Sequence, residues 1–167
     1  MKNLYIDFDG VILNTIDVTY RLLEEENIDL KDVEKVQNFY KTLDWKNLLS
    51  ITPEINNAFN CIQELLDSKK YNISILTHVN SMDEIIEKVK FIRKHTDHLT
   101  IIPVPKPLSK TKMVRAKDAI LVDDYTKNLK EWEKEGGIGI KFTQKEKESE
   151  FITINCLNQL LEMEYVK

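Results

Sequence analysis

The sequence predicts an open α/β fold, in which a parallel β-sheet is flanked by helices. Short apolar runs recur along the chain, and the segments between them carry apolar residues at helical spacing. Nearly continuous apolar runs are typical of strands that are buried on both faces of a parallel sheet. The alternation of the two patterns favours an α/β sheet.

Five apolar runs are the predicted strands. The first stops at Asp9-Gly10, the second at Thr77-His78 and the fourth at Asp123-Asp124. The third ends in a cluster of prolines, and the fifth is the weakest of the set. The runs cover residues 4–8, 73–76, 99–104, 119–122 and 139–142.

Three segments between the strands carry helix signals. Thr52-Pro53 is predicted to open the first helix, as an N-cap residue followed by a first-turn proline. Ser81 and Glu84 form a capping-box pattern at the start of the second, and Gly136-Gly137 ends the third. The predicted apolar faces consist of Ile55, Phe59, Ile62 and Leu66 in the first helix, Ile85, Ile86, Val89 and Ile92 in the second, and Leu129 and Trp132 in the third.

The connection after the first strand is too long for one crossover helix. We expect residues 14–51 to form a small helical cap, inserted into an α/β core of residues 1–13 and 52–167, and to act as a lid over the site. Aromatic cap residues could stack on a nucleobase, with Trp45 the first choice, although packing within the insertion is the commoner fate of such side chains. They are Tyr20, Phe39, Tyr40 and Trp45.

Composition and charge narrow the range of partners. The 167 residues carry a formal net charge of −4, so no global basic field attracts a nucleic-acid polymer, whereas a single nucleotide needs only a local pocket. No stretch approaches the roughly 18 consecutive apolar residues of a membrane span, and the N-terminus runs at once into a predicted strand. We therefore expect neither a membrane segment nor a signal peptide. Cys61 and Cys156 lack metal-type spacing and are expected to be reduced, core-facing thiols of a cytoplasmic protein rather than a disulfide.

Reactive side chains fall at the ends of three predicted strands. Because ligands of a parallel α/β sheet bind at the carboxyl ends of its strands, we expect these side chains to line one site. Crowded carboxylates raise each other's pKa or require a counter-cation, and hard oxygen ligands without a His or Cys cluster select Mg²⁺. The residues are Asp7, Asp9, Thr77, Asp123 and Asp124, with Lys112, or Lys110 two residues earlier, just before the fourth strand.

This combination suits phosphoryl transfer. Mg²⁺ and a lysine would hold the phosphoryl oxygens, and Thr77 would donate a hydrogen bond. Asp7 and Asp9 project to the same side of an extended backbone, so one could attack phosphorus while the other protonates the leaving oxygen and then activates water. An isolated Asp-x-Asp could merely cap a turn after a strand, but its combination with the other strand-end groups favours the chemical interpretation.

The same residues resemble the four motifs of the haloacid dehalogenase (HAD) superfamily of phosphohydrolases. Asp7-Phe8-Asp9-Gly10-Val11 looks like the first motif, D-x-D-G-V, and Thr77, Lys112 and Val122-Asp123-Asp124 look like the second, third and fourth, in that order. The resemblance spans residues 4–124. It implies a Rossmann-like sheet with a small helical cap inserted after the first strand.

The resemblance also implies a role for each residue. Asp7 would be the nucleophile and Asp9 the general acid/base, a pair typical of the phosphatase branch rather than of the dehalogenases. Three lysines lie in the region of the third motif, namely Lys106, Lys110 and Lys112. Lys112 is the preferred one, and Lys110 is the next choice. Thr77 and Lys112 would hold the phosphoryl group, and Mg²⁺ would bind the Asp7 carboxylate, the Asp9 backbone carbonyl and Asp124, with Asp123 nearby.

The sequence therefore predicts a Mg²⁺-dependent phosphatase that acts on a small phosphate monoester, either a phosphorylated metabolite or a nucleotide. The short cap and residues 121–142 further resemble the 5'(3')-deoxyribonucleotidase branch. A mutase or other phosphotransferase would share the aspartyl-phosphate, and a binding protein could keep the fold without activity. A receiver-type signalling domain is disfavoured, because its phosphorylated aspartate follows a middle strand, whereas the middle strands here end in Thr77 and Pro103.

Overall fold

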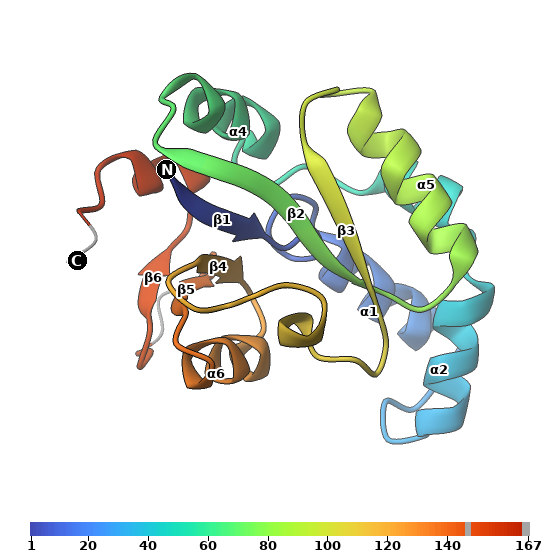
Figure 1. Ribbon diagram of the computed structural model, residues 1–167. Helices are drawn as coiled ribbons and strands as arrows, with labels where there is room; N and C mark the ends of the chain where they lie inside the picture. Colours follow the sequence, from blue (N-terminus) through green and yellow to red (C-terminus); the bar gives the residue numbers. More distant parts are fainter. Residues whose placement is uncertain (146–147, 165–167) are drawn as a thin grey trace.

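The computed structural model describes residues 1–145 and 148–164. Its centre is a six-stranded sheet with the strand order β3-β2-β1-β4-β5-β6, in which every neighbouring pair is parallel (Figure 1). The predicted α/β fold with a parallel sheet is confirmed. The strands are β1 (Lys2–Ile6), β2 (Tyr71–Val79), β3 (Thr100–Pro105), β4 (Ile120–Asp123), β5 (Ile138–Phe142) and β6 (Ile152–Ile154).

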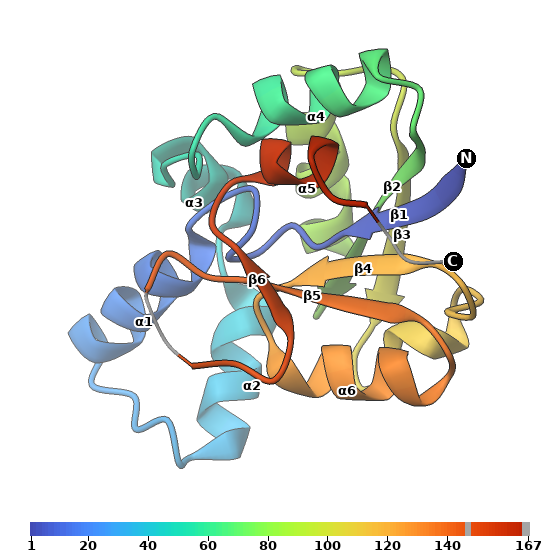
Figure 2. The same cartoon turned by 90° about the vertical axis from the view of Figure 1, so that its left-hand side faces the viewer.

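Helices cover both faces of the sheet (Figure 2). One face carries α4, α5 and the 3₁₀ helix η2, and the other carries α6. The helices are α1 (Thr15–Glu25), α2 (Val33–Thr42), α3 (Trp45–Ile51), α4 (Ala58–Asp67), α5 (Met82–Arg93) and α6 (Thr126–Lys134), with the 3₁₀ helices η1 (Lys110–Lys112) and η2 (Leu157–Leu161). None of the helices in the described part of the chain combines the length and apolar character that a membrane crossing requires.

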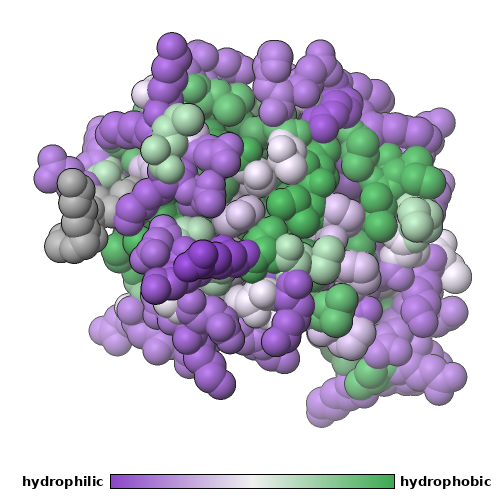
Figure 3. Space-filling view, viewed as in Figure 1, coloured by the Kyte–Doolittle hydropathy of each residue, from purple (hydrophilic) through white to green (hydrophobic). Residues whose placement is uncertain are grey.

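The central strands are apolar because both of their faces are buried. In β4, Ile120 and Val122 belong to the larger core cluster, on the side of α4, whereas Leu121 belongs to the smaller cluster, on the side of α6. Successive strand residues point to opposite faces, so a strand covered on both sides needs an apolar residue at each position. The edge strand β3 differs, since Ile101, Ile102 and Pro103 are only half-buried. Figure 3 shows the resulting hydrophobic surface over β2 and β3, bordered by hydrophilic side chains.

The strand register brings the reactive strand ends together. Ile6 of β1 pairs with Val122 of β4 on one side and with Ile75 of β2 on the other. One residue further along, the backbone N–H of Asp7 donates to the carbonyl of Val122 at 2.9 Å. The carboxyl ends of the central strands therefore meet at one edge of the sheet, where the inserted helices α1 and α2 also lie (Figures 1 and 2).

The segment between β1 and α4 is helical, as expected for residues 14–51. Its third helix is built into the core, because Trp45, Leu48 and Leu49 of α3 belong to the same buried cluster as β1. The division of the chain into a core of residues 1–13 and 52–167 and a cap of residues 14–51 stays a prediction. Residues 146–147 and 165–167 of that core range lie outside the described residues.

Two local predictions are wrong. The helix expected to open at Thr52-Pro53 begins at Ala58, because Thr52 instead ends α3, where its hydroxyl donates to the carbonyl of Leu48 at 2.6 Å. Ile55 then runs beside the loop after β1, and its N–H donates to the carbonyl of Ile12 at 2.9 Å. The predicted set of strands also lacks β6, whose three residues are too few to show a period.

Cys61 of α4 and Cys156, which precedes η2, lie next to each other. They are thiols in the structure, with their Sγ atoms 3.6 Å apart. Cys61 is buried and Cys156 is half-buried against the core.

Candidate active site

Three carboxylates meet where β1 and β4 end. Asp7 directly follows β1, Asp123 is the last residue of β4, and Asp124 comes next. Each offers one oxygen, and these oxygens all lie within 4.8 Å of one another. Three like charges at this spacing repel each other unless protons or a cation neutralise them.

Asp7 is buried at the end of β1 and faces Lys110. Burial raises the pKa of Asp7 to about 7; the ammonium group of Lys110 opposes this shift, and the charges of Asp123 and Asp9 add to it. Asp7 Oδ1 lies 2.9 Å from Lys110 Nζ and forms an ion pair with it. Lys110 is therefore the charge partner of this buried oxygen, and the Asp7 side chain also lines the cavity described below.

Asp123 is held rigidly beneath this cluster. It is fully buried, and Oδ2 accepts hydrogen bonds from Lys110 Nζ at 2.7 Å and from Asn128 Nδ2 at 2.9 Å, while Oδ1 accepts from the N–H of Tyr125 at 2.8 Å. Asp123 thus places Lys110 next to Asp7.

The lysine at this position is Lys110, which corrects the preference for Lys112. Lys110 is 1% exposed and bridges Asp7 and Asp123, whereas Lys112 is exposed to solvent. Both residues lie in η1. A 3₁₀ helix has three residues per turn, so side chains two positions apart point in directions that differ by about 240°.

Gly10 gives Asp124 the space that it occupies. The φ angle of Gly10 is +74°, and a Cβ atom there would lie 2.3 Å from Asp124 Oδ2. Both features require glycine. Burial raises the pKa of Asp124 to about 8, and the charges of Asp7 and Asp123 add to the effect.

Asp9 lies close to the cluster but has different neighbours. Asp9 Oδ1 accepts a hydrogen bond from Thr15 Oγ1 at 2.7 Å, and Oδ2 accepts from Lys88 Nζ at 2.6 Å and from Thr77 Oγ1 at 3.4 Å. Burial alone would raise the pKa of Asp9, but the charge and hydrogen bond of Lys88, with smaller contributions from Thr15 and Lys106, together hold the pKa below its usual value. Thr77 is 1% exposed, and the structure therefore places its hydroxyl among protein groups beside Asp9.

The donor set fits the Mg²⁺ ion that the sequence predicts. The candidate ligand atoms are carboxylate oxygens, and the raised pKa values of Asp7 and Asp124 would be lowered again by a bound cation. Asp7 and Asp124 would supply side-chain oxygens, and Asp123, which belongs to the same group, is held by Lys110, Asn128 and the N–H of Tyr125. The side chain of Asp9 is engaged by Thr15 and Lys88, which leaves only its backbone carbonyl as the expected ligand.

Comparison with known proteins identifies the fold. No protein-family profile and no curated protein sequence matches the chain. Among solved structures, the chain is similar to a HAD phosphatase from Thermococcus onnurineus, with a TM-score of 0.63, 15% sequence identity and 97% of each chain covered. It is also similar to a hydrolase from Pseudomonas syringae, with a TM-score of 0.65, 12% identity and 97% of each chain covered. A HAD-superfamily hydrolase from Geobacter sulfurreducens has a TM-score of 0.59 at 12% identity, and the match covers 97% of this chain and 98% of the other.

The chain has the HAD-like fold. At sequence identities this low, the structural similarity establishes the fold only. The chemistry of the site depends on the residues of this chain.

Two charged residues of this site were not expected from the sequence. Glu84 and Lys88 of α5 are each 1% exposed, and with Ile92 they form the fully buried stripe of the helix. The predicted apolar face is wrong in part, since Ile86 is 44% exposed. The spacing of Glu84 and Lys88, four residues apart, was visible in the sequence, but it is also the commonest pattern of a solvent-exposed ion pair.

The acidic edge opens into a cavity of about 630 Å³. Its floor includes Asp7, Asp9 and Asp124. The HAD-like core and the inserted helices both contribute walls. Apolar and aromatic side chains come from the insertion, and basic residues come from the loop after β3 and from α6; they include Tyr20, Leu23, Leu30, Val36, Tyr40, Lys106 and Lys127.

Trp45 also borders the cavity, but it is mainly a packing residue. It is 2% exposed, and its indole Nε1 donates to the carbonyl of Tyr40 at 3.3 Å. Tyr20 is 52% exposed and Tyr40 is half-buried, so these two rings offer more surface to a ligand than Trp45 does.

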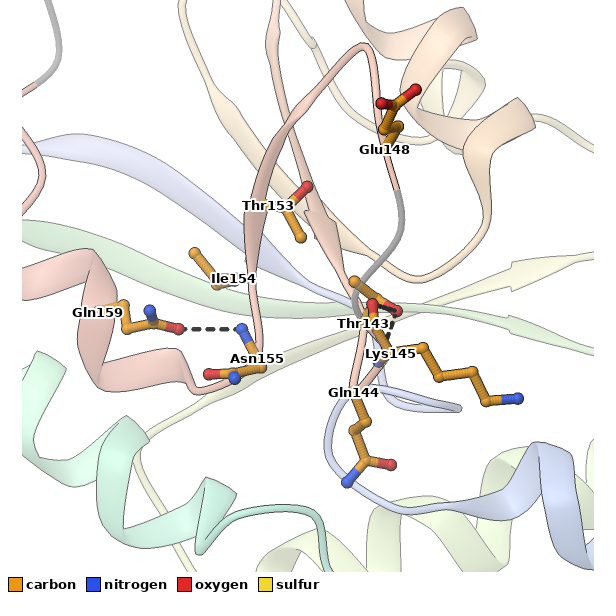
Figure 4. A pocket seen from close by; sticks show the side chains of 8 residues that line it. All are labelled: Thr143, Gln144, Lys145, Glu148, Thr153, Ile154, Asn155 and Gln159. Atoms are coloured by element: carbon orange, nitrogen blue, oxygen red, sulfur yellow. Dashed lines mark hydrogen bonds between the residues drawn. The ribbon is translucent and has the colours of Figure 1, made fainter.

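A second hollow, of about 590 Å³, lies beside β5 and β6 (Figure 4). Its polar groups are partly used by the protein itself, because Gln159 Oε1 accepts from the N–H of Asn155 at 2.9 Å and Thr143 Oγ1 accepts from the N–H of Lys145 at 3.1 Å. It shares no lining residue with the acidic cavity. The acidic cavity is therefore the candidate active site.

Proposed function

We propose that this HAD-like chain is a Mg²⁺-dependent phosphohydrolase that acts on small phosphate monoesters through an aspartyl-phosphate on Asp7. The observation that carries the proposal is the position of Asp7, which lines the cavity beside Lys110 and the Asp123–Asp124 pair. Bound Mg²⁺ would supply positive charge for the phosphoryl oxygens.

The residues divide the reaction into two displacements. In the first, a carboxylate oxygen of Asp7 attacks phosphorus, the bond from phosphorus to the leaving oxygen breaks, and Asp9 gives its proton to that oxygen. In the second, Asp9 takes a proton from water, the water oxygen attacks phosphorus, and the bond to Asp7 breaks. Lys110 stabilises the negative charge beside Asp7 throughout.

Asp9 needs a proton for the first displacement, although its pKa in the free protein is low. A phosphoryl dianion bound next to Asp9 repels negative charge and so raises the pKa of the carboxyl group in the complex. Substrate binding thereby favours the protonated form of Asp9.

The shape of the cavity suggests the size and kind of substrate. A volume of about 630 Å³ suits a small metabolite. The phosphoryl group would lie at the carboxylate floor, and the leaving group would face Tyr20, Tyr40 and the apolar cap residues, with Lys106 and Lys127 at the edge. Nucleotides satisfy this description, and hydrolysis of a nucleotide in the cytoplasm is the specific form of the proposal.

The test is hydrolysis of 4-nitrophenyl phosphate by the purified protein with Mg²⁺, followed by a panel of phosphorylated metabolites and nucleotides. We expect Asp7→Asn to lower kcat by at least roughly 10³-fold, because it removes the nucleophile. Thermal unfolding should show that the variant is folded, and chelation of Mg²⁺ should abolish the wild-type rate.

Product analysis separates the alternatives. Release of inorganic phosphate supports hydrolysis, and transfer of the phosphoryl group to an added alcohol or sugar supports a phosphotransferase. If the wild-type protein with Mg²⁺ cleaves none of the esters, the enzymatic proposal is wrong.

A further inference from the structure

Lys88 is an unusual residue to find beneath the candidate active site. It lies in the middle of α5, and its side chain is 1% exposed. Its ammonium group lies 2.6 Å from Asp9 Oδ2, 2.7 Å from Glu84 Oε1, 3.2 Å from the carbonyl of His78 and 3.3 Å from Thr77 Oγ1. A buried charge is costly unless it is paired, so these contacts account for its presence but not for its purpose.

Glu84 fixes the position of Lys88. It is 1% exposed, and Oε2 accepts hydrogen bonds from the N–H of Asn80 at 2.7 Å and from Asn80 Nδ2 at 3.0 Å. The remaining oxygen faces Lys88 from one helical turn away. The rings of Phe8 and Trp45 enclose the ammonium group, with centroids 5.3 Å and 5.1 Å away. Lys88 therefore has little freedom to move.

The same arrangement fixes Asp9. Thr15 of α1 holds one carboxylate oxygen, and Lys88 of α5 holds the other. The side chain of Asp9 is still 20% exposed and lines the cavity. Asp9 thus faces the ligand space in one orientation that two separate helices impose.

Stability alone gives a poor account of the Glu84–Lys88 pair. Burying two charges costs several kcal/mol per ion, and well-packed neutral side chains of similar volume are often as stable or more so. Glu84 alone would neutralise Lys88, yet the shortest contact of Lys88 is with Asp9. Such an arrangement is expected where the carboxylate of Asp9 has to keep a fixed orientation.

We infer that Lys88 is a positioning residue, anchored by Glu84, that holds Asp9 in the orientation for proton transfer to the leaving group. This inference rests on the proposed function. Lys88 donates no proton in the reaction: the proton on the leaving oxygen comes from Asp9, while the bond from phosphorus to that oxygen breaks and the bond to Asp7 forms. Lys88 keeps the Asp9 oxygen within reach of that bond.

The test compares two leaving groups. The leaving oxygen of 4-nitrophenyl phosphate needs little protonation, whereas that of an alkyl phosphate such as glycerol phosphate needs a full proton. Positioned acid catalysis typically contributes 10²–10⁴-fold. In single-turnover experiments with the Lys88→Met/Glu84→Gln variant, we expect release of the alcohol to slow by roughly 10²-fold and release of 4-nitrophenolate by less than about 10-fold. KM should change little for both substrates.

The double substitution leaves no buried charge without a partner at positions 84 and 88, which favours folding. Lys90→Met is the matched control, because Lys90 lies on the same helix with a 62% exposed side chain that pairs with Glu87. It should keep the wild-type ratio of the two rates. Thr15→Val releases Asp9 from the opposite side, and it should shift the ratio in the same direction as the double variant.

An equal loss for both substrates, or an unchanged ratio, would overturn the inference and leave the proposed function standing. A wild-type protein without activity on either ester would overturn both, so the two failures are distinguishable.

Discussion

Asp7 and Asp9 are separated by one residue, yet their surroundings push their pKa values in opposite directions. Burial and neighbouring carboxylates raise the pKa of Asp7 to about 7, whereas Lys88, together with Thr15 and Lys106, outweighs burial and lowers the pKa of Asp9. In the free protein these shifts oppose the proposed roles, because a nucleophile attacks as the carboxylate and a general acid has to carry a proton. Bound Mg²⁺ would favour the deprotonated form of Asp7, and a phosphoryl dianion bound beside Asp9 would favour its protonated form.

Gly10 supports the first prediction at this scale. In Gly10→Ala, the new Cβ would collide with Asp124 Oδ2, in addition to the strain of a positive φ angle. We expect the substitution to displace Asp124, to weaken Mg²⁺ binding by at least about tenfold and to cost more than the roughly 1 kcal/mol of the backbone strain alone. Isothermal titration with Mg²⁺ and urea unfolding measure the two effects.

Gly136 provides the matched control. Its φ angle is +80°, but the atom nearest to an added methyl group, Lys117 Cγ, would be 3.6 Å away. Gly136→Ala should therefore show the strain without the loss of Mg²⁺ affinity. Equal Mg²⁺ affinities for the two variants would contradict the role assigned to Gly10.

At the scale of elements, the 3₁₀ helix η1 decides which lysine enters the site. Lys110→Met should leave Asp7 and Asp123 buried without their shared partner, at a cost of about 3–5 kcal/mol in the free energy of unfolding, and it should abolish hydrolysis. Lys112→Met changes an exposed side chain, and its effect on stability should stay within about 0.5 kcal/mol. Urea unfolding and the rate with 4-nitrophenyl phosphate check both variants, and the reverse ranking would refute the assignment of Lys110.

The same elements mark how far sequence reasoning reaches. The aspartates could be placed because they end strands, and a buried parallel strand has a strong apolar signal, as in β1 and β4. Lys110 could not be separated from Lys112, because a three-residue helix shows no period and both are lysines. Lys88 could not be found at all, since a buried Glu–Lys pair and an exposed one look alike in sequence.

A competing local hydrogen bond overrode the helix-start signal at Thr52. Thr-Pro is a good helix start, but the threonine hydroxyl found a nearer partner in the last turn of α3. Ser81 was predicted correctly as an N-cap, and its Oγ accepts from the N–H of Glu84 at 3.1 Å. The other half of that capping box is missing, because the Glu84 carboxylate binds Asn80 and Lys88 instead.

For the whole molecule, the acidic cluster links stability to pH and to Mg²⁺. The pKa values of Asp7 and Asp124 are raised to about 7 and about 8, whereas in the unfolded chain both groups titrate near 4, at about the ordinary value. Between these limits the native protein holds more protons than the unfolded chain, so stability falls as pH rises. Without a cation, we expect the melting temperature to decrease from pH 5 to pH 8 through these two groups.

Mg²⁺ binds the deprotonated carboxylates and should oppose that loss. Thermal unfolding with chelator and with saturating Mg²⁺ should show a larger stabilisation at pH 8 than at pH 5. Asp124→Asn should reduce both the pH dependence and the response to Mg²⁺. A larger effect of Mg²⁺ at pH 5 would mean that the cluster is not its binding site.

The helices α1, α2 and α3 are contiguous in sequence, but they cannot be exchanged as one unit. Trp45, Leu48 and Leu49 of α3 share a buried cluster with Leu4 and Ile6 of β1. Exchanging the whole of residues 14–51 for the equivalent segment of another protein would thus open a hole under the central strand. A graft restricted to α2, residues 33–42, leaves the buried cluster of α3 and β1 intact. Substitutions in α2 are therefore the best way to change the preference for the leaving group.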